Sequence, residues 1–522
     1  MRSAEFILFL LIAVAVLVTV ARRLGVAYPI FLVLGGLALG LVPRVPHVEV
    51  DPDVIFVLVL PPIVYIASLF TPLRTLRANI GNVASLAVGL VVASALVVAA
   101  VAHALVPGLS WPVALLLGAI TSPSDEVAVT QVAARYALPR RVLSLLEGES
   151  LLNDATAVTL YRVALFAVLA GTFSMASAAG TFLVSGIGGI AVGLIVGWLI
   201  AQVRRRVSDT PVELTITLLT PYAAFLPAEA LNFSGVIATV VAGLYLGNRL
   251  SRISSADTRL AGRSVWEMLI FLLNGFVFIL TGLEVPYVLS RLAPSEIVRL
   301  IAIGVAVTIS LVVVRTLWIF GTAYLPPLWR RRKPVRHVFG QSVVISWAGL
   351  RGVISLAIVL ALPQTLPNGS PFPARAELLV VTLTVIMLTL VGQGLTLPWV
   401  ISRVHLGVDT EVREEEAAAR RRLVRAATRR IDELYAVWPT HHPLLDELRE
   451  RYRHRSEHVE GRPDASLDEA DRDVIEHREI RRNVAEAERE TLLRMRAAGD
   501  IDDDVLRKLE RELDLEEQRG EA

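Results

Sequence analysis

The stretch EGESLLND, residues 147–154, decides the fold because it places acids and an amide inside a long apolar segment. The surrounding residues 141–170 are rich in Leu, Val and Ala, and a helix of about 20 such residues crosses the ~30 Å hydrocarbon layer of a membrane. A charged side chain at mid-bilayer costs ~2.5–3.5 kcal/mol on insertion scales, so buried acids usually face a cavity or a partner. The stretch therefore predicts a polar site inside a membrane-spanning helix.

Helical spacing divides these polar side chains into two neighbouring stripes. Ser150 and Asp154 are four residues apart and share one face of a helix, and Glu149 and Asn153 form a second such pair. Together they make an oxygen-rich wall, and oxygen ligands are what a hard cation needs once its water is removed. The pattern therefore predicts a cation site.

The composition also indicates a membrane protein. The 522 residues are 54% hydrophobic and only 19% charged, with a mean hydropathy of +0.59, whereas a soluble chain normally carries more charge. The absence of cysteine excludes disulfides and thiol chemistry. We interpret residues 6–20 as a first span and not as a signal peptide, because Arg22, Arg23 and a second apolar run follow. Apolar runs predict an all-α protein with about thirteen spans, at 4–21, 28–42, 52–70, 80–105, 112–134, 141–170, 180–203, 210–230, 233–248, 264–285, 296–325, 337–363 and 376–403.

Basic residues in the short loops orient these spans. Arginine and lysine concentrate in every second loop, which is typical of loops that face the cytoplasm. We therefore expect a multi-pass protein of the cell membrane with its N-terminus outside and its C-terminus in the cytoplasm. The basic loops contain Arg22/Arg23, Arg74/Arg77, Arg135/Arg140/Arg141, Arg204/Arg205/Arg206, Arg249/Arg252/Arg259/Arg263 and Arg330/Arg331/Arg332/Lys333/Arg336.

Two of the predicted spans are interrupted. The fifth contains TSPSDE (121–126), where Pro123 removes an amide donor and clashes with the preceding turn, and the twelfth contains SWAGLRG (346–352). Unwound backbone at membrane depth is tolerated only where it lines a cavity or is buried in protein. The breaks fall in the fifth span of each of two six-span sets, spans 1–6 and 8–13, with span seven as a linker. Matching broken spans predict two inverted repeats with a transport site where the broken helices meet.

The C-terminal part of the chain has a different composition. Residues 405–522 are rich in Glu, Arg and Ala and carry mixed-sign charge pairs at helical spacing. We therefore expect a transmembrane domain at 1–404 and a cytoplasmic helical tail at 405–522. The tail is either a solvated appendage or an element that regulates the protein or supports a dimer.

Several motifs resemble the signatures of the monovalent cation:proton antiporter-1 family, which includes the sodium/proton exchangers. GESLLNDATAVTLY (148–161) is similar to the family's Asn-Asp segment. Four further stretches look like other family signatures in the same order, namely LPPIVYIASLFTPLR (60–74), TSPSDEVAVT (121–130), FLLNGFVFILTGLE (271–284) and WAGLRGVISLA (347–357). The resemblance covers about residues 1–400 and implies the family's thirteen-helix fold with crossed broken helices.

The resemblance implies secondary active antiport of sodium, or a similar monovalent cation, against protons by alternating access. Asp154 would bind cation or proton competitively, the Asn before it would imply electroneutral one-for-one exchange, and Glu149 would pair with Arg351. Ser150 and the Thr121 backbone would help to ligate the ion, while Asn153 would brace the unwound span. The candidate ion-binding residues are thus Asp154, Ser150, Asn153, Thr121 and Asp125. The family implies a homodimer in the lipid bilayer, no cofactor besides the transported ions, and no nucleic-acid partner.

The chain departs from the family pattern at two places. Some relatives carry an acid shortly after the double proline of the third span, but no acid follows Pro61-Pro62 here, so a third-span ligand would be Tyr65, Ser68 or none. Glu126 stands where the family often has proline. It is either a second acid at the cytoplasmic funnel or a first-turn residue favoured by the helix dipole.

Other functions and other residue roles remain as alternatives. Rival transport functions are potassium/proton antiport, an organic-solute/proton carrier and a channel. An intramembrane protease would need an Asp–Asp, Ser–His or HExxH constellation, which the sequence lacks, so we do not expect an enzyme. Arg162 and Arg315 lie inside spans and either extend to polar ends or pair with buried acids. Glu229 lines the mouth of the site or faces solvent.

Overall fold

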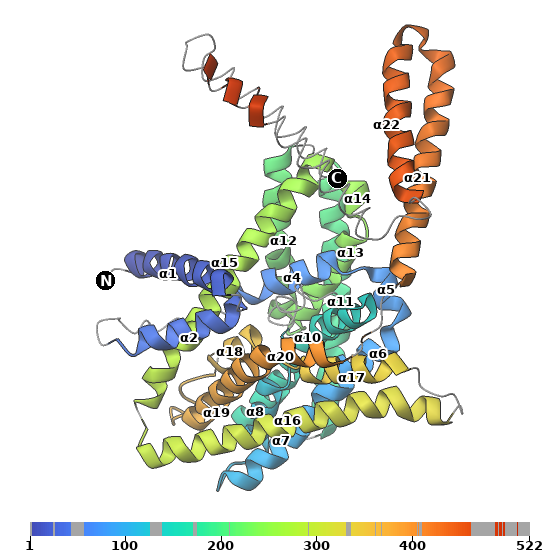
Figure 1. The fold of residues 1–522 in the computed structure, drawn as a ribbon. Coiled ribbons are helices and arrows are strands. Elements are labelled where there is room, and N and C mark those ends of the chain that lie inside the picture. Colours follow the sequence, from blue (N-terminus) through green and yellow to red (C-terminus); the bar gives the residue numbers. More distant parts are fainter. Residues whose placement is uncertain are drawn as a thin grey trace. The chain divides into compact units, whose positions relative to one another are not determined.

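In a computed structural model the chain forms two compact units, Met1–Val408 and Asp409–Ala522. The regular elements of the described residues are helices, with one isolated β-bridge between Thr365 and Pro371 (Figure 1). The structure describes residues 3–460 except 25–26, 43–56, 126–137, 171–174, 208, 291, 330–335, 361, 367, 405 and 407–409, together with a few residues between 486 and 509.

The first unit contains long helices and shorter helices that pack beside them. Two π-helical segments, η1 and η2, interrupt α-helical runs. In chain order the elements are α1 (Ser3–Leu24), α2 (Tyr28–Gly40), α4 (Leu60–Phe70), α5 (Leu73–Ala78), α6 (Ile80–Ala84), η1 (Ser85–Leu90), α7 (Val91–Leu105), α8 (Trp111–Thr121), α10 (Arg140–Ala170), α11 (Met175–Arg204), α12 (Thr210–Ala230), α13 (Gly235–Gly247), α14 (Leu250–Ile253), α15 (Ala256–Leu289), α16 (Pro294–Trp329), α17 (Arg336–Trp347), α18 (Val353–Leu360), α19 (Arg375–Met387), η2 (Leu388–Gln393) and α20 (Gly394–Arg403).

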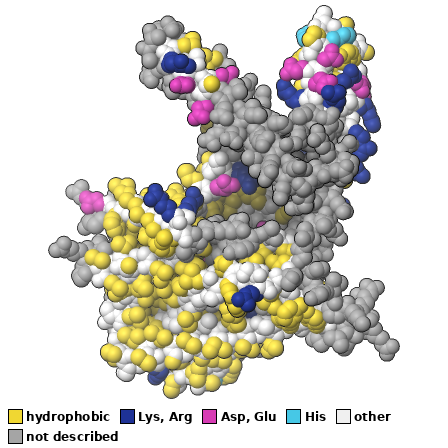
Figure 2. All heavy atoms as spheres, in the orientation of Figure 1, with side chains coloured by type: hydrophobic (Ala, Val, Ile, Leu, Met, Phe, Trp, Pro, Cys, Tyr) yellow, Lys and Arg dark blue, Asp and Glu magenta, His cyan; other side chains and the backbone are white. Residues whose placement is uncertain are grey.

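Several of these helices have the length and apolar surface of membrane spans. Among the described residues six helical segments are long and apolar enough to cross a bilayer, and shorter apolar helices accompany them. Their outward side chains are also apolar, since Val184 and Ile187 of α11 are 62% and 66% exposed. Figure 2 shows hydrophobic side chains over much of the described surface of this unit on the face drawn. Such a surface suits lipid contact, and the chain is a multi-pass membrane protein.

Both predicted helix breaks are confirmed. Helix α8 ends at Thr121, two residues before Pro123, and the chain is non-helical through Asp125. Helix α17 ends at Trp347 and α18 begins at Val353, so the intervening residues are non-helical. The remainder of the predicted fifth span, including Glu126, lies outside the described residues.

The helices of the first unit pack into two groups, which we call bundle A and bundle B. Bundle A consists of α1, α2, α4, α11, α12, α13 and α15, with α15 along α2 and α13 against both α4 and α11. Bundle B consists of η1, α7, α8, α10, α16, α17, α18, α19, η2 and α20, with α10 against α8 and α16 against α7, α17 and α19. The bundles meet where α10 contacts α4 and α13 and where α15 contacts α18 and α19.

Two local features were not expected from the sequence. The predicted spans 80–105 and 376–403 each contain a π-helical segment, η1 and η2; π-segments inside helices occur frequently at functional sites. Helix α15 begins at Ala256, eight residues before the predicted limit. It begins there because the Ser255 hydroxyl caps it by accepting a hydrogen bond from the Thr258 amide at 3.2 Å.

The second unit contains a pair of packed helices. Helix α21 (Thr410–Val437) and helix α22 (His442–Glu460) are joined by a short 3₁₀ turn and contact each other. Val424, Ile431 and Leu445 are buried between mostly charged surfaces. Across the pair Arg449 binds Asp432, and the rings of Tyr435 and His442 stack with centroids 4.4 Å apart. The mixed-sign helical pattern of this part of the sequence is thus explained by a charged helical pair.

Candidate ion-binding site

The two helix breaks contact each other directly. The Asp125 amide donates a hydrogen bond of 2.7 Å to the carbonyl of Leu350, which joins the fifth-span break to the twelfth-span break. Gly352 packs so closely against Asp125 that a Cβ at this position would overlap the carboxylate. Glycine is therefore required at 352 for the close approach of the two non-helical segments.

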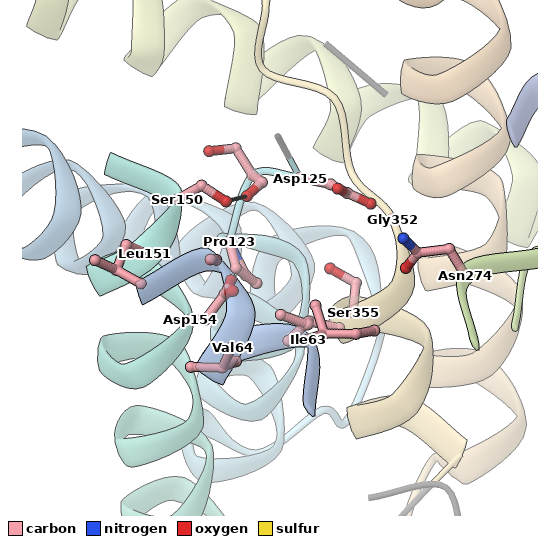
Figure 3. A pocket seen from close by; sticks show the side chains of 13 residues that line it. Ile63, Val64, Pro123, Asp125, Ser150, Leu151, Asp154, Asn274, Gly352 and Ser355 are labelled. Atoms are coloured by element: carbon pink, nitrogen blue, oxygen red, sulfur yellow. Dashed lines mark hydrogen bonds between the residues drawn. The ribbon is translucent and has the colours of Figure 1, made fainter. Parts of the chain in front are cut away.

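A small cavity lies at this crossing. Its volume is about 30 Å³, against the ~10–15 Å³ that one water molecule needs, so it has room for a dehydrated small cation or very few waters. Figure 3 shows Asp154 and Ser150 on one side of this space and Asn274 on another, near Gly352. The lining residues are Ile63, Val64, Ala67, Pro123, Ser124, Asp125, Ser150, Leu151, Asp154, Asn274, Gly352, Ile354 and Ser355.

Helix α10 carries the two polar stripes that its sequence spacing predicts. Ser150 and Asp154 both line the cavity and are only 6% and 8% exposed. Glu149 and Asn153 are buried beside the cavity and do not line it. One stripe is thus available to an ion, while the other contacts neighbouring protein segments.

Ser124 connects the unwound segment to α10, a role that sequence reasoning missed. Its hydroxyl donates to Glu149 Oε1 at 2.9 Å and accepts from Asn153 Nδ2 at 2.8 Å. Its carbonyl accepts from Asn153 Nδ2 at 3.1 Å and from the Ser150 hydroxyl at 3.2 Å. The break therefore has a defined position relative to α10. The position of Ser124 within the TSPSDE break was the sequence signal for this role. A serine in an unwound segment has many possible partners, however, so the signal did not identify the residues that it contacts.

Glu149 pairs with Arg315, and the predicted pairing with Arg351 is not the one that the structure forms. Both terminal nitrogens of Arg315 bind the Glu149 carboxylate, one of them at 2.8 Å, and the two side chains are 3% and 2% exposed. Arg315 Nε also donates to the carbonyl of Ile345 at 3.0 Å. The pair therefore joins α10, α16 and α17 inside bundle B. The sequence signal for Arg315 as the partner of Glu149 was its position as an arginine in the middle of the eleventh predicted span, 296–325.

Arg351 lies in the twelfth-span break and is 3% exposed. Its backbone amide donates to the Thr389 hydroxyl at 3.2 Å. Among the described residues, Nε and one terminal nitrogen of its guanidinium have no hydrogen-bond partner. Arg351 therefore adds positive charge near Glu149 and Arg315 without replacing Arg315 in the ion pair.

Three of the other candidates lie away from the cavity wall. Thr121 is buried at the end of α8, where its hydroxyl donates to the Leu117 carbonyl at 2.9 Å. Tyr65 packs on Trp266 with ring centroids 5.5 Å apart, and the Ser68 hydroxyl donates to the Tyr65 carbonyl at 2.7 Å. None of the three lines the cavity. Helix α4 contributes only apolar side chains to it.

Two further ion pairs of the first unit lie away from the cavity. Arg162 of α10 binds Glu229 of α12, which also accepts a hydrogen bond from the Gly235 amide at 2.8 Å. These two side chains are 28% and 26% exposed and connect bundle B to bundle A. Arg204 and Glu213 form a second pair at 2.7 Å inside bundle A. Pairing with an acid, and not extension to a polar end, thus accounts for both Arg162 and Arg315.

Comparisons with known proteins match the part of the chain that contains the cavity and its helices. A family model described as the transmembrane sodium/hydrogen exchanger matches residues 8–403. A Mycobacterium tuberculosis protein named as an uncharacterised Na⁺/H⁺ exchanger is 37% identical over 520 residues, covering 98% of this chain and 95% of that protein. A Bacillus subtilis protein named as a sodium, potassium, lithium and rubidium/H⁺ antiporter is 29% identical over 500 residues, covering 92% and 72%.

A solved structure has a similar fold. The sodium proton antiporter MjNhaP1 from Methanocaldococcus jannaschii matches with a TM-score of 0.61 at 20% sequence identity. The match covers 78% of this chain and 100% of that one. At this identity the likeness concerns the fold alone.

Proposed function

Because the chain belongs to the sodium/hydrogen exchanger family, we propose that it exchanges sodium, or a similar monovalent cation, for protons across a membrane. The observation that carries this proposal is the position of Asp154. Its carboxylate and the Ser150 hydroxyl line a 30 Å³ cavity at the crossing of two broken helices. Ser150, Asp154 and Asp125 offer oxygen atoms, the ligand type that hard cations prefer.

Competition at Asp154 couples the two ion fluxes. A carboxylate that holds a proton has lost the negative charge that attracts a cation, and a bound cation in turn disfavours protonation. The cavity is too small to hold a hydrated cation and a second bound cation at the same time. Each arriving cation therefore displaces a proton, and each arriving proton displaces a cation.

The buried charges of bundle B favour one-for-one exchange without net charge movement. Among the described residues, Arg315 and Arg351 offset Glu149 and Asp125 in formal charge, and the net charge of this group is the same whether Asp154 is protonated or holds a monovalent cation. Moving an empty, ionised Asp154 carboxylate through a low-dielectric region costs more free energy than moving a loaded one. We infer that only the two loaded forms cross the membrane barrier readily, which makes the exchange obligatory.

We further propose alternating access by movement of bundle B relative to bundle A. The proposed topology is about thirteen spans in two inverted six-span repeats, with the N-terminus outside and the tail, 405–522, in the cytoplasm. The cell membrane is the proposed location, and a homodimer is the proposed assembly. Asn153 and Ser124 hold the unwound segment against α10, and Thr121 terminates α8. They act as supports of the site, whereas Asp154, Ser150 and Asp125 contact the ion.

The size of the cavity argues against an organic substrate. Pockets for drug-sized molecules measure about 300–1,000 Å³, far more than the 30 Å³ available here. Potassium/proton antiport is the second candidate, because the B. subtilis relative is named for four alkali cations. The ion order, meaning the order of preference among sodium, lithium and potassium, is therefore a property to be measured.

Exchange by the purified protein in liposomes tests the proposal. A pH-sensitive dye inside the vesicles reports proton movement when sodium, lithium or potassium is added outside, with and without a clamped membrane potential. We expect sodium-driven proton efflux at the same rate under both conditions, and none with Asp154→Asn. Absence of exchange by the unmodified protein, or equal exchange by Asp154→Asn, contradicts the proposal.

A further inference from the structure

Asn274 is a polar residue on the cavity wall, opposite Asp154 and Ser150 (Figure 3). Asn274 lies in the middle of α15, is 0% exposed and lines the cavity. Among the described residues, neither the nitrogen nor the oxygen of its side-chain amide has a hydrogen-bond partner of ordinary geometry. The Tyr28 hydroxyl lies nearby without ordinary hydrogen-bond geometry to the amide. A buried amide left without partners costs about 1–3 kcal/mol per unsatisfied group, so a purely structural role does not explain it.

The position of Asn274 relative to the two bundles is distinctive. Asp154, Ser150, Ser124, Asp125 and Ser355 all reach the cavity from bundle B. Bundle A contributes three apolar residues of α4, namely Ile63, Val64 and Ala67, and the single polar side chain of Asn274. Among the described residues Asn274 is thus the polar group that bundle A presents to the ion.

The apolar wall of α4 explains why this group matters here. No acid follows Pro61-Pro62, and neither Tyr65 nor Ser68 reaches the cavity. A monovalent cation that leaves water needs several oxygen ligands, and α4 supplies none. The amide oxygen of Asn274 is a neutral oxygen ligand, and it accepts no hydrogen bond of ordinary geometry from the part of the chain that the structure describes.

We propose that Asn274 contacts the transported cation through its amide oxygen and thereby helps to set ion affinity and ion order. The inference rests on the proposed antiport function and concerns the same site. Because Asn274 belongs to bundle A, its contact with the ion depends on how the two bundles are placed. It is therefore available in one placement of bundle B and is lost when bundle B moves away, which assists ion release.

The test replaces Asn274 and measures exchange in liposomes as a function of sodium, lithium and potassium concentration. Asn274→Leu keeps a similar volume and removes the amide. Loss of one ligand to a charged group is expected to raise the half-saturating sodium concentration by about tenfold, with the maximal rate within about twofold of the unmodified protein. Asn274→Gln keeps the amide and narrows the cavity, so the ratio of lithium to potassium exchange is expected to rise.

Thr281→Val is the matched control on the same helix. Thr281 is 1% exposed, but its hydroxyl donates to the Val277 carbonyl at 2.7 Å and it does not line the cavity. We expect this variant to keep the half-saturating concentration and the ion order of the unmodified protein. If Asn274→Leu does not fold, the lithium-to-potassium ratio of Asn274→Gln decides alone.

Two results would overturn the inference. One is an unchanged half-saturating concentration and ion order in every folded Asn274 variant. The other is an equal loss of rate for all three ions with no change in half-saturation, since a structural role produces that result. Failure of the antiport proposal is distinguishable, because the unmodified protein would then show no cation-driven proton movement at all.

Discussion

Replacing Glu149 by glutamine removes the negative charge from a buried ion pair and leaves Arg315 in place. The two side chains are 2% and 3% exposed, and both Glu149 oxygens are bound by the guanidinium. Removing one partner of such a pair costs about 3–5 kcal/mol, because the remaining charge is buried without compensation. Glu149→Gln, and equally Arg315→Gln, are therefore expected to destabilise the protein by about that amount.

A double-mutant cycle identifies the partner of Glu149. In the Glu149→Gln/Arg315→Gln double variant neither charge remains, so the loss of stability should be far smaller than the sum of the two single losses. The corresponding cycle of Glu149 with Arg351→Gln should show a much smaller interaction energy, because Arg351 makes no direct ion pair with Glu149 in the structure. Thermal unfolding of the purified variants in detergent provides the measurement.

The control is the exposed pair of Arg263 and Glu267, whose side chains are 73% and 66% exposed. Exposed pairs contribute about 0–1 kcal/mol, so Glu267→Gln should hardly change the unfolding temperature. The reasoning is refuted if Glu149→Gln lowers the unfolding temperature no more than Glu267→Gln does. It is equally refuted if Glu149 couples to Arg351 and not to Arg315.

Two further predictions concern hydrogen bonds and ion pairs around the site. Ser124→Ala removes the hydroxyl between Glu149 and Asn153; it should cost about 1–3 kcal/mol in unfolding experiments and lower the maximal exchange rate. Unchanged stability and rate would show that Ser124 does not hold the unwound segment. Glu229→Gln breaks the pair between bundles A and B; this partly exposed pair contributes about 1 kcal/mol or less to stability, but its loss should change the maximal rate more than twofold at constant half-saturating sodium. Arg162→Gln should have the same effect, and opposite effects of the two variants would contradict a shared role.

The sequence predicted those parts of the site that depend on local rules. Pro123 and the glycines around Arg351 indicated the two breaks, because proline and glycine act on the backbone at their own positions. The four-residue spacing of Ser150 and Asp154 predicted a common helix face, and both line the cavity. The apolar runs likewise indicated a membrane protein, since bilayer thickness directly sets the length of a span.

The sequence did not predict which distant side chains meet. Arg315 and Arg351 are both arginines inside apolar segments, and only the packing of α16 against α17, which in turn contacts α10, brings Arg315 to Glu149. Asn274 stands among apolar residues of α15 with no local sign that it reaches a cavity. Ser124 forms hydrogen bonds with three residues of α10, and these bonds depend on the path of the unwound segment.

Proton release on ion binding reports competition at Asp154 without transport. Purified protein in weakly buffered detergent solution is mixed with sodium chloride, and choline chloride serves as the control for ionic strength. We expect release of up to one proton per chain as sodium binds to the protonated protein, and no release from Asp154→Asn. Sodium binding without proton release, or the same release from Asp154→Asn, would contradict it.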